Sequence, residues 1–156
     1  MTDELTIELV PWSQLKQEEV EHIQQLFSSE GLPISVSSSF YVRKAAEVPP
    51  IIQIVIIVPF IWFAKGFFTR MGEDTWEGLK RGLKKAHNYL KERYKRDPDK
   101  EICFQHNDER IIVSLPREDD ERLSEALQSL PQYLEEQRGE ETRIVYDEDK
   151  REWHRL

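Results

Sequence analysis

The stretch IIQIVIIVPFIWFAKGFF, residues 51–68, is the most apolar part of the sequence, and its interpretation decides the fold. Read as one continuous helix, its eighteen residues reach the lower limit for crossing a membrane. However, Pro59 lies in the middle of the stretch, and the polar residues Gln53 and Lys65 interrupt it. A membrane span would have to accommodate all three, so we favour a division at Pro59.

The division predicts a strand followed by a helix. Residues 51–58 are almost all β-branched, which is typical of a strand buried on both faces of a sheet. Pro59 then fits the first turn of a helix, where a missing N–H has little effect. The apolar residues that follow at helical spacing are Phe60, Phe63, Ala64, Phe67 and Met71.

The rest of the chain alternates between strand and helix periodicity. Around the apolar stretch we expect a strand over 5–10, a helix over 13–29 and a strand over 33–42. The elements expected after it are a helix over 74–95, strands over 101–105 and 110–115, a helix over 119–130 that Pro131 kinks or restarts, and a hairpin of 142–146 with 151–156.

This order of elements predicts an α+β fold, with a mixed, mostly antiparallel sheet and helices packed on one face. The specific topology that we expect is a split βαβ, ferredoxin-like arrangement. The length favours a single domain over 1–156, with an internal linker over 43–50 and a C-terminal hairpin extension over 142–156.

Composition and charge exclude several classes of protein. The net charge of −8 makes the chain as a whole a poor nucleic-acid binder. Cys103 is the one cysteine, so no intramolecular disulfide can form. The first residues lack the basic and apolar regions of a secretory signal, and a cytoplasmic location is therefore expected.

The residue types of a nucleophilic site occur once, as Cys103, His106 and Asp108. Side chains three apart on a strand point to opposite faces, so we interpret Cys103 as core and the other two as a solvated turn. The four histidines show no metal-ligand spacing, and no phosphate-binding glycine motif is present. We therefore predict no catalytic residue, no metal ligand and no cofactor.

The helix expected over 74–95 carries a basic surface. Residues 73–96 contain eight basic and four acidic side chains, a charge of +4, which leaves −12 on the rest of the chain. This surface suits an acidic partner, an anionic lipid surface or a nucleic-acid backbone. The simpler interpretation, which we favour, is a solvated face that complements the acidic helix beside it, residues 118–136. The residues that define the basic surface are Lys80, Arg81, Lys84, Lys85 and Lys91.

The favoured function is a non-enzymatic interaction or adaptor module. The apolar residues Ile61, Trp62 and Phe68 lie off the main helical stripe, so the aromatic segment 59–76 is predicted to bind a protein partner or a second copy. One alternative is membrane association through 51–68. Another is a small hydrolase whose composite site only the fold would assemble.

The layout of residues 4–136 resembles the small α/β accessory proteins called effector-associated constant components. The corresponding block runs from Ile51 through FAKGFFTRMGEDTWEGLKRGL. These proteins are encoded beside bacterial conflict and immunity effectors. The resemblance implies a non-catalytic signalling or adaptor component of a bacterial antiphage system, and it implies no catalytic residue.

Overall fold

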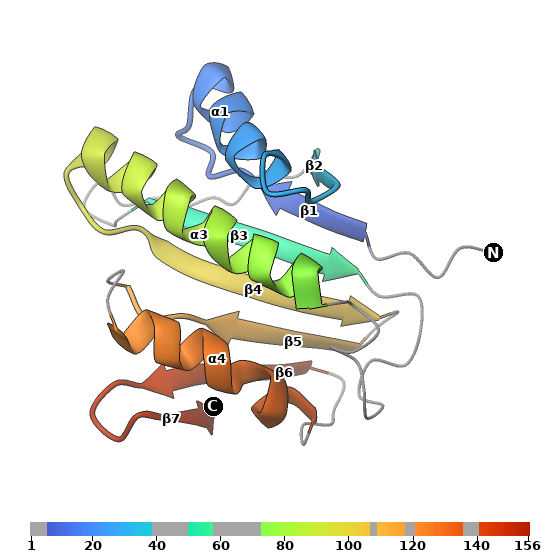
Figure 1. Cartoon of the computed structure of the whole chain (residues 1–156), viewed down its shortest axis with the longest axis vertical. Helices are drawn as coiled ribbons and strands as arrows, with labels where there is room; N and C mark the ends of the chain where they lie inside the picture. Colours follow the sequence, from blue (N-terminus) through green and yellow to red (C-terminus); the bar gives the residue numbers. More distant parts are fainter. Residues whose placement is uncertain (1–5, 39–49, 58–72, 107–108, 118–120, 136–140) are drawn as a thin grey trace.

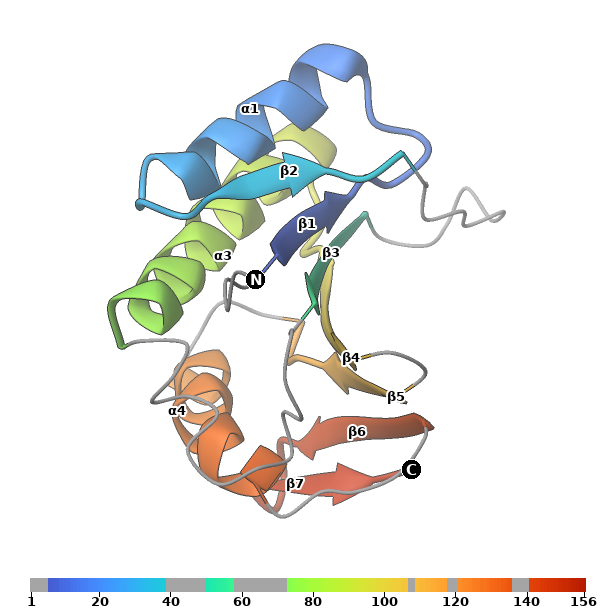
Figure 2. The same cartoon turned by 90° about the vertical axis from the view of Figure 1, so that its right-hand side faces the viewer.

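The computed structural model describes residues 6–38, 50–57, 73–106, 109–117, 121–135 and 141–156. Within these residues, a seven-stranded mixed sheet carries three helices on one of its faces (Figure 1, Figure 2). The elements in chain order are β1 (Thr6–Val10), α1 (Gln17–Ser28), β2 (Ile34–Val36), β3 (Ile51–Ile57), α3 (Glu73–Tyr94), β4 (Asp99–His106), β5 (Glu109–Ser114), α4 (Glu121–Glu135), β6 (Glu141–Asp147) and β7 (Glu152–Arg155).

The sheet is built from three strand–helix–strand units. Its strand order is β2-β1-β3-β4-β5-β6-β7, and parallel and antiparallel pairs alternate across it. Each parallel pair, β1 with β2, β3 with β4 and β5 with β6, has one of the three described helices in the connection between its strands. A parallel pair needs such a long crossover, whereas β4–β5 and β6–β7 are antiparallel pairs with short connections.

The expected α+β class, the mixed sheet and the placement of helices on one face are confirmed. The connection of the strands differs from a split βαβ, ferredoxin-like order, because the parallel strands of each unit are direct neighbours. Three pairings are parallel and three are antiparallel. The C-terminal hairpin continues the same sheet, since β6 pairs with β5.

β3 lies inside the sheet, between β1 and β4, and confirms the strand half of the divided apolar stretch. Ile52, Ile54 and Ile56 are buried against the helices. Among the alternate residues, Ile51 is buried, whereas Val55 is half-buried and Gln53 donates a 2.8 Å hydrogen bond to Glu101. Residues 58–72, including the helix expected after Pro59, lie outside the described residues. No helix in the described ranges is long and apolar enough to cross a membrane.

The helices bury the apolar stripes that the sequence predicts. On α3, Trp76, Leu79, Leu83, Ala86 and Leu90 are all buried, and on α4, Leu123, Ala126, Leu127 and Leu130 are fully buried. All nine side chains belong to one core cluster shared with the inward residues of the strands. Pro131 lies inside α4, which continues to Glu135, so the helix does not restart at this residue.

α1 begins later than expected and packs closely on α3. Its N-cap is Lys16 rather than a residue near Ser13. The two helices approach at glycines: a Cβ on Gly82 would overlap the ring of Phe27, and one on Gly78 would lie 2.9 Å from the backbone oxygen of Glu30, just after α1. Only residues without a side chain permit this distance, so these glycines are required for the contact.

A buried carboxylate joins α1 to the end of α3. Glu19 is 2% exposed and accepts hydrogen bonds from the Lys16 N–H at 2.8 Å, from the Tyr94 hydroxyl at 2.9 Å and from the Arg93 guanidinium. Burial alone would raise the pKa of Glu19, but these donors together lower it below its usual value of 4.5. Burial and the neighbouring Glu19 raise the pKa of Tyr94 to about 12.

The lowered pKa predicts a pH-dependent contribution of Glu19 to stability. Because the folded-state pKa lies below the unfolded one, the contribution is present above pH 4.5 and is lost as the pH falls through the folded-state pKa. We expect Glu19→Gln to lower the free energy of unfolding by about 1–3 kcal/mol at pH 7. Urea unfolding at decreasing pH should show this difference shrinking below pH 4.5. Glu18→Gln, at an exposed neighbouring position, is the control, and a difference that stays constant with pH would contradict the assignment.

Candidate functional site

The residues of the predicted basic surface all lie on α3, outside its buried stripe. Lys85, Arg81 and Lys91 have side chains that are 47%, 54% and 56% exposed, whereas that of Lys80 is 21% exposed. The predicted partner-binding residues Ile61, Trp62 and Phe68 lie outside the described residues. Trp76, at the end of the same aromatic segment, belongs to the core.

Most of these basic side chains pair with acids just after α1, on α3 or just after α3. Arg81 contacts Glu30 through Nε at 2.7 Å, and Lys85 contacts the other oxygen of the same carboxylate. These two hydrogen bonds lower the pKa of Glu30. Lys80 pairs with Glu77 at 2.7 Å within α3, and Lys91 lies 3.2 Å from the Asp97 carboxylate.

These pairs differ from the simpler interpretation of the basic face. That interpretation expected the lysines and arginines to complement the acidic helix over 118–136. In the described part of the chain, the carboxylates that they contact lie elsewhere. The contact with α4 is made by Lys84, and its partner there is the hydroxyl of Ser124.

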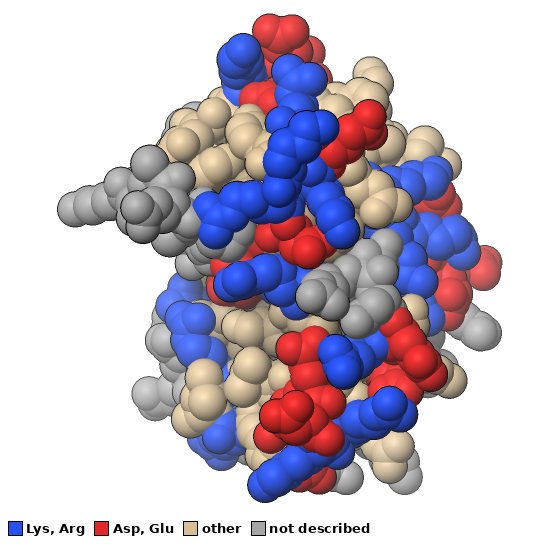
Figure 3. All heavy atoms as spheres, turned by 90° about the vertical axis from the view of Figure 1, so that its left-hand side faces the viewer, with Lys and Arg blue, Asp and Glu red and all other residues tan. Residues whose placement is uncertain are grey.

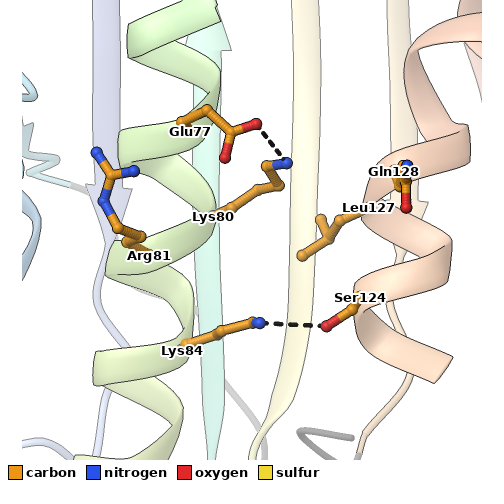
Figure 4. Close-up of a pocket in the computed structure, with 7 residues that line it drawn as sticks. All are labelled: Glu77, Lys80, Arg81, Lys84, Ser124, Leu127 and Gln128. Carbon is orange, nitrogen blue, oxygen red and sulfur yellow. Dashed lines mark hydrogen bonds and ion pairs between the residues drawn. The ribbon is translucent and has the colours of Figure 1, made fainter. Parts of the chain in front are cut away.

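A groove between α3 and α4 collects part of the basic surface (Figure 4). Its volume is about 300 Å³. In Figure 4, Lys80 and Lys84 extend toward α4, while Arg81 points to the opposite side of α3. The residues that line the groove are Glu77, Lys80, Arg81 and Lys84 from α3 and Ser124, Leu127 and Gln128 from α4.

Lys84 is the basic residue of the groove that is best placed to receive a ligand. Its ammonium donates a hydrogen bond to Ser124 Oγ at 3.1 Å, and this acceptor is neutral. A carboxylate oxygen in the same place would add the attraction between opposite charges to this hydrogen bond. The hydroxyl of Ser124 and the amide of Gln128 would be additional donors on the opposite wall.

The basic character is local. Figure 3 shows the molecule from the left of Figure 1, and on that side Lys and Arg side chains are interspersed with Asp and Glu. Opposite charges that alternate over a surface do not create a field of one sign at a distance. A ligand would therefore recognise the groove through its individual donors.

A second polar cluster is buried at the C-terminal end of α3. His87 is 1% exposed and Lys100, on β4, is 2% exposed. The Lys100 ammonium lies 2.7 Å from His87 Nδ1 and donates to the carbonyl oxygens of Pro98 and Arg117. His87 Nε2 lies 3.0 Å from Asp97 Oδ1. This carboxylate favours a proton on Nε2, which leaves Nδ1 to accept from Lys100.

The row of Asp97, His87 and Lys100 contains the residue types of a proton relay. Burial of Asp97 alone would raise its pKa, but Lys91 and His87 together lower it, so this carboxyl is ionised at neutral pH. None of the three side chains lines the groove or the two other cavities described in this protein. The Asp97 end of the row reaches solvent, with a side chain that is 22% exposed, and the contact with His87 helps to satisfy the buried ammonium of Lys100.

Sequence reasoning missed this cluster, although one signal was available. Lys100 precedes Ile102 and Phe104 at the period of two, so the alternation of β4 places the lysine on the buried face. The partner, His87, follows Leu83 by four residues and therefore shares the buried side of α3. The two residues are 13 positions apart and lie on different elements, so the sequence pattern does not predict their contact.

The residues considered for a nucleophilic site are not brought together as far as the structure describes them. Cys103 is buried in the middle of β4. Position 106 lies on the opposite face of the strand, and Asp108 lies outside the described residues. Among the described side chains, no group of three or more His, Cys, Asp or Glu could hold a metal ion.

The geometry defines an α+β protein with a mixed seven-stranded sheet and a small basic groove between two helices. Compared with known proteins, the chain matches no protein-family model, no curated protein and no solved structure.

Proposed function

We propose that this protein is a non-enzymatic interaction module whose α3–α4 groove binds an acidic side chain of a protein partner. The observation that carries the proposal is the contact of Lys84 with the neutral hydroxyl of Ser124. The other basic side chains described above already face carboxylates, which they would have to leave in order to bind a ligand. Lys84 needs only to exchange a hydroxyl for a carboxylate.

The size and walls of the groove support a side chain as the ligand. About 300 Å³ is the lower end of the range for small-molecule sites. Leu127 supplies an apolar contact for the methylenes of a glutamate, while Lys84 and Gln128 face its carboxylate end. A long polyanion is disfavoured, because the whole chain carries a net charge of −8.

The setting that we propose follows the resemblance to effector-associated constant components. The module would work in the bacterial cytoplasm as an accessory of a conflict or antiphage effector. Ile61, Trp62 and Phe68 would add an apolar contact with the same partner, or with a second copy. Flotation of the protein with anionic liposomes would instead favour the membrane alternative.

Lys84→Glu tests the groove. We expect this variant to lose about tenfold in affinity for a fluorescent ten-residue peptide of alternating Glu and Gly, because a charged hydrogen bond becomes a repulsion. Fluorescence anisotropy measures the affinity. NMR spectra of the labelled protein should place the peptide-induced shifts at Ser124 and Gln128.

The control is Lys150→Glu, which changes the net charge equally in the exposed turn before β7. If the affinity for the peptide falls equally in both variants, binding depends on the net charge of the protein, and the groove is not the binding site. A single-stranded oligonucleotide that binds more tightly than the peptide, with the same dependence on Lys84, would identify a nucleic-acid partner and overturn the proposal.

A further inference from the structure

Among the described elements, β7 is an edge strand that pairs on one side only. In the strand order, β7 pairs with β6 alone, and no described helix or strand lies beyond it in either view (Figure 1, Figure 2). The N–H of Leu156 donates to the carbonyl of Arg143 on β6 at 2.8 Å. Because an antiparallel strand alternates the direction of its backbone groups, those of Trp153 and Arg155 point away from β6. These groups can pair with a further strand.

A cavity of about 250 Å³ lies beside this edge, between β7 and α4. The ring of Trp153 forms one wall and that of Tyr133 another, with centroids 6.3 Å apart. Trp153 Nε1 donates to Ala126 O at 3.2 Å and to Ser129 Oγ at 3.0 Å, which fixes the orientation of the indole. The cavity therefore has a preformed apolar wall next to the unpaired backbone groups.

An edge strand with an adjacent side-chain cavity is the arrangement by which domains bind extended peptides. The main-chain hydrogen bonds of the added strand provide affinity, and the cavity selects one of its side chains. Here the residue opposite Trp153 would carry the selected side chain, because both would lie on the helix-covered face of the sheet.

The charges along the edge indicate which strand fits. Arg151 contacts Glu125 of α4 at 3.4 Å and is 62% exposed, so it lies on the helix-covered side of the edge. Arg155, also exposed, lies on the same face as Trp153, two residues further along β7. Trp153 is thus flanked by two cations at a spacing of two residues.

A second copy of this chain fits poorly in the antiparallel register centred on Trp153. In that register Arg151 of each copy, in the turn just before β7, would face Arg155 of the other. Like charges directly opposite each other destabilise a strand pair. A strand with acidic residues two positions before and after a central apolar residue would form two opposite-charge pairs instead.

From these observations we propose that β7 binds an extended segment of a partner protein by strand addition. The segment has the pattern acidic–x–apolar–x–acidic, and its apolar side chain occupies the β7–α4 cavity. This surface is separate from the α3–α4 groove and does not depend on the function proposed for that groove.

The probe is a labelled nine-residue peptide with Leu at its centre, Glu two residues to either side and Thr at the intervening positions. Its binding should protect the amides of Trp153 and Arg155 from hydrogen exchange, because only strand addition covers these groups. Arg155→Glu should weaken binding about fivefold. Two further peptides each carry Lys in place of one of the two Glu residues. The peptide whose Lys faces position 155 should recover affinity for Arg155→Glu, because the charges of that pair are then opposite again.

Arg143→Glu is the matched control, since it changes the same charge at an exposed position on the neighbouring strand. Equal weakening by both variants, or no protection of the two amides, overturns the proposal. Protection of the same amides without peptide, together with dimers in sedimentation, identifies a second copy as the occupant and also overturns it. Lys84→Glu should leave binding of this peptide unchanged, so failure of one proposal is distinguishable from failure of the other.

Discussion

Replacing Trp76 by alanine is expected to lower the free energy of unfolding by about 3–5 kcal/mol. Trp76 is 7% exposed and begins the apolar stripe of α3, within the central core cluster. The truncation removes a large buried surface and leaves a cavity that the rigid sheet cannot close. For a protein of this size the melting temperature should fall by roughly 6–20 °C, as measured by circular dichroism.

The control for Trp76→Ala is charge reversal on the opposite side of α3, as Lys84→Glu/Lys85→Glu. Exposed ion pairs contribute little to stability, so this variant should melt close to the native protein. It should nevertheless lose the acidic peptide that we propose for the groove. If Trp76→Ala melts normally while the lysine variant unfolds, the orientation of α3 is wrong.

Lys100→Met is expected to lower the free energy of unfolding by a similar amount. The cause here is the loss of buried hydrogen bonds and not the loss of packing. The substitution leaves His87 Nδ1 and the carbonyl oxygens of Pro98 and Arg117 without the ammonium that now donates to them. A buried acceptor that loses its partner costs about 1–3 kcal/mol. We expect a loss of roughly 3–5 kcal/mol in urea unfolding at pH 7.

Two further variants test the origin of this effect. Lys91→Met makes the same replacement at the exposed edge of the cluster, where we expect a change within about 1 kcal/mol. His87→Leu/Lys100→Met removes both members of the buried contact and should be less destabilised than the sum of the single variants, with a coupling of about 0.5–3 kcal/mol. Strict additivity, or a Lys100→Met variant as stable as the native protein, would refute this account.

The elements of this fold could be predicted because local periodicity carries their signal. The stripe from Trp76 to Leu90 repeats at helical spacing, and the β-branched run that begins at Ile51 favours a strand. Boundaries were less accurate. α1 begins at Gln17 because Glu19 closes the first turn onto the Lys16 N–H, whereas the serine near position 13 suggested an earlier start.

The candidate sites could be predicted only in part. The sequence placed Lys84 on a basic helix face, but it could not show that Ser124, 40 residues later, would be the partner of its ammonium. Likewise, the closing hairpin was evident, whereas the cavity beside Trp153 exists because α4 packs across that strand. Both sites lie between two elements that are far apart in the sequence. The spacing of residues within one helix or strand therefore cannot predict them.

Within the described residues, local sequence patterns were enough to identify most strands and helices and their apolar faces, since both depend on neighbours within a few residues. Only the tertiary structure decided that each parallel pair consists of adjacent strands, that Lys100 meets His87 in the core, and that β7 forms an edge. The order of strands and the partners of buried charges depend on contacts between residues far apart in the chain. Many arrangements satisfy the same local pattern, and the packing of helices on one face of the sheet selects among them.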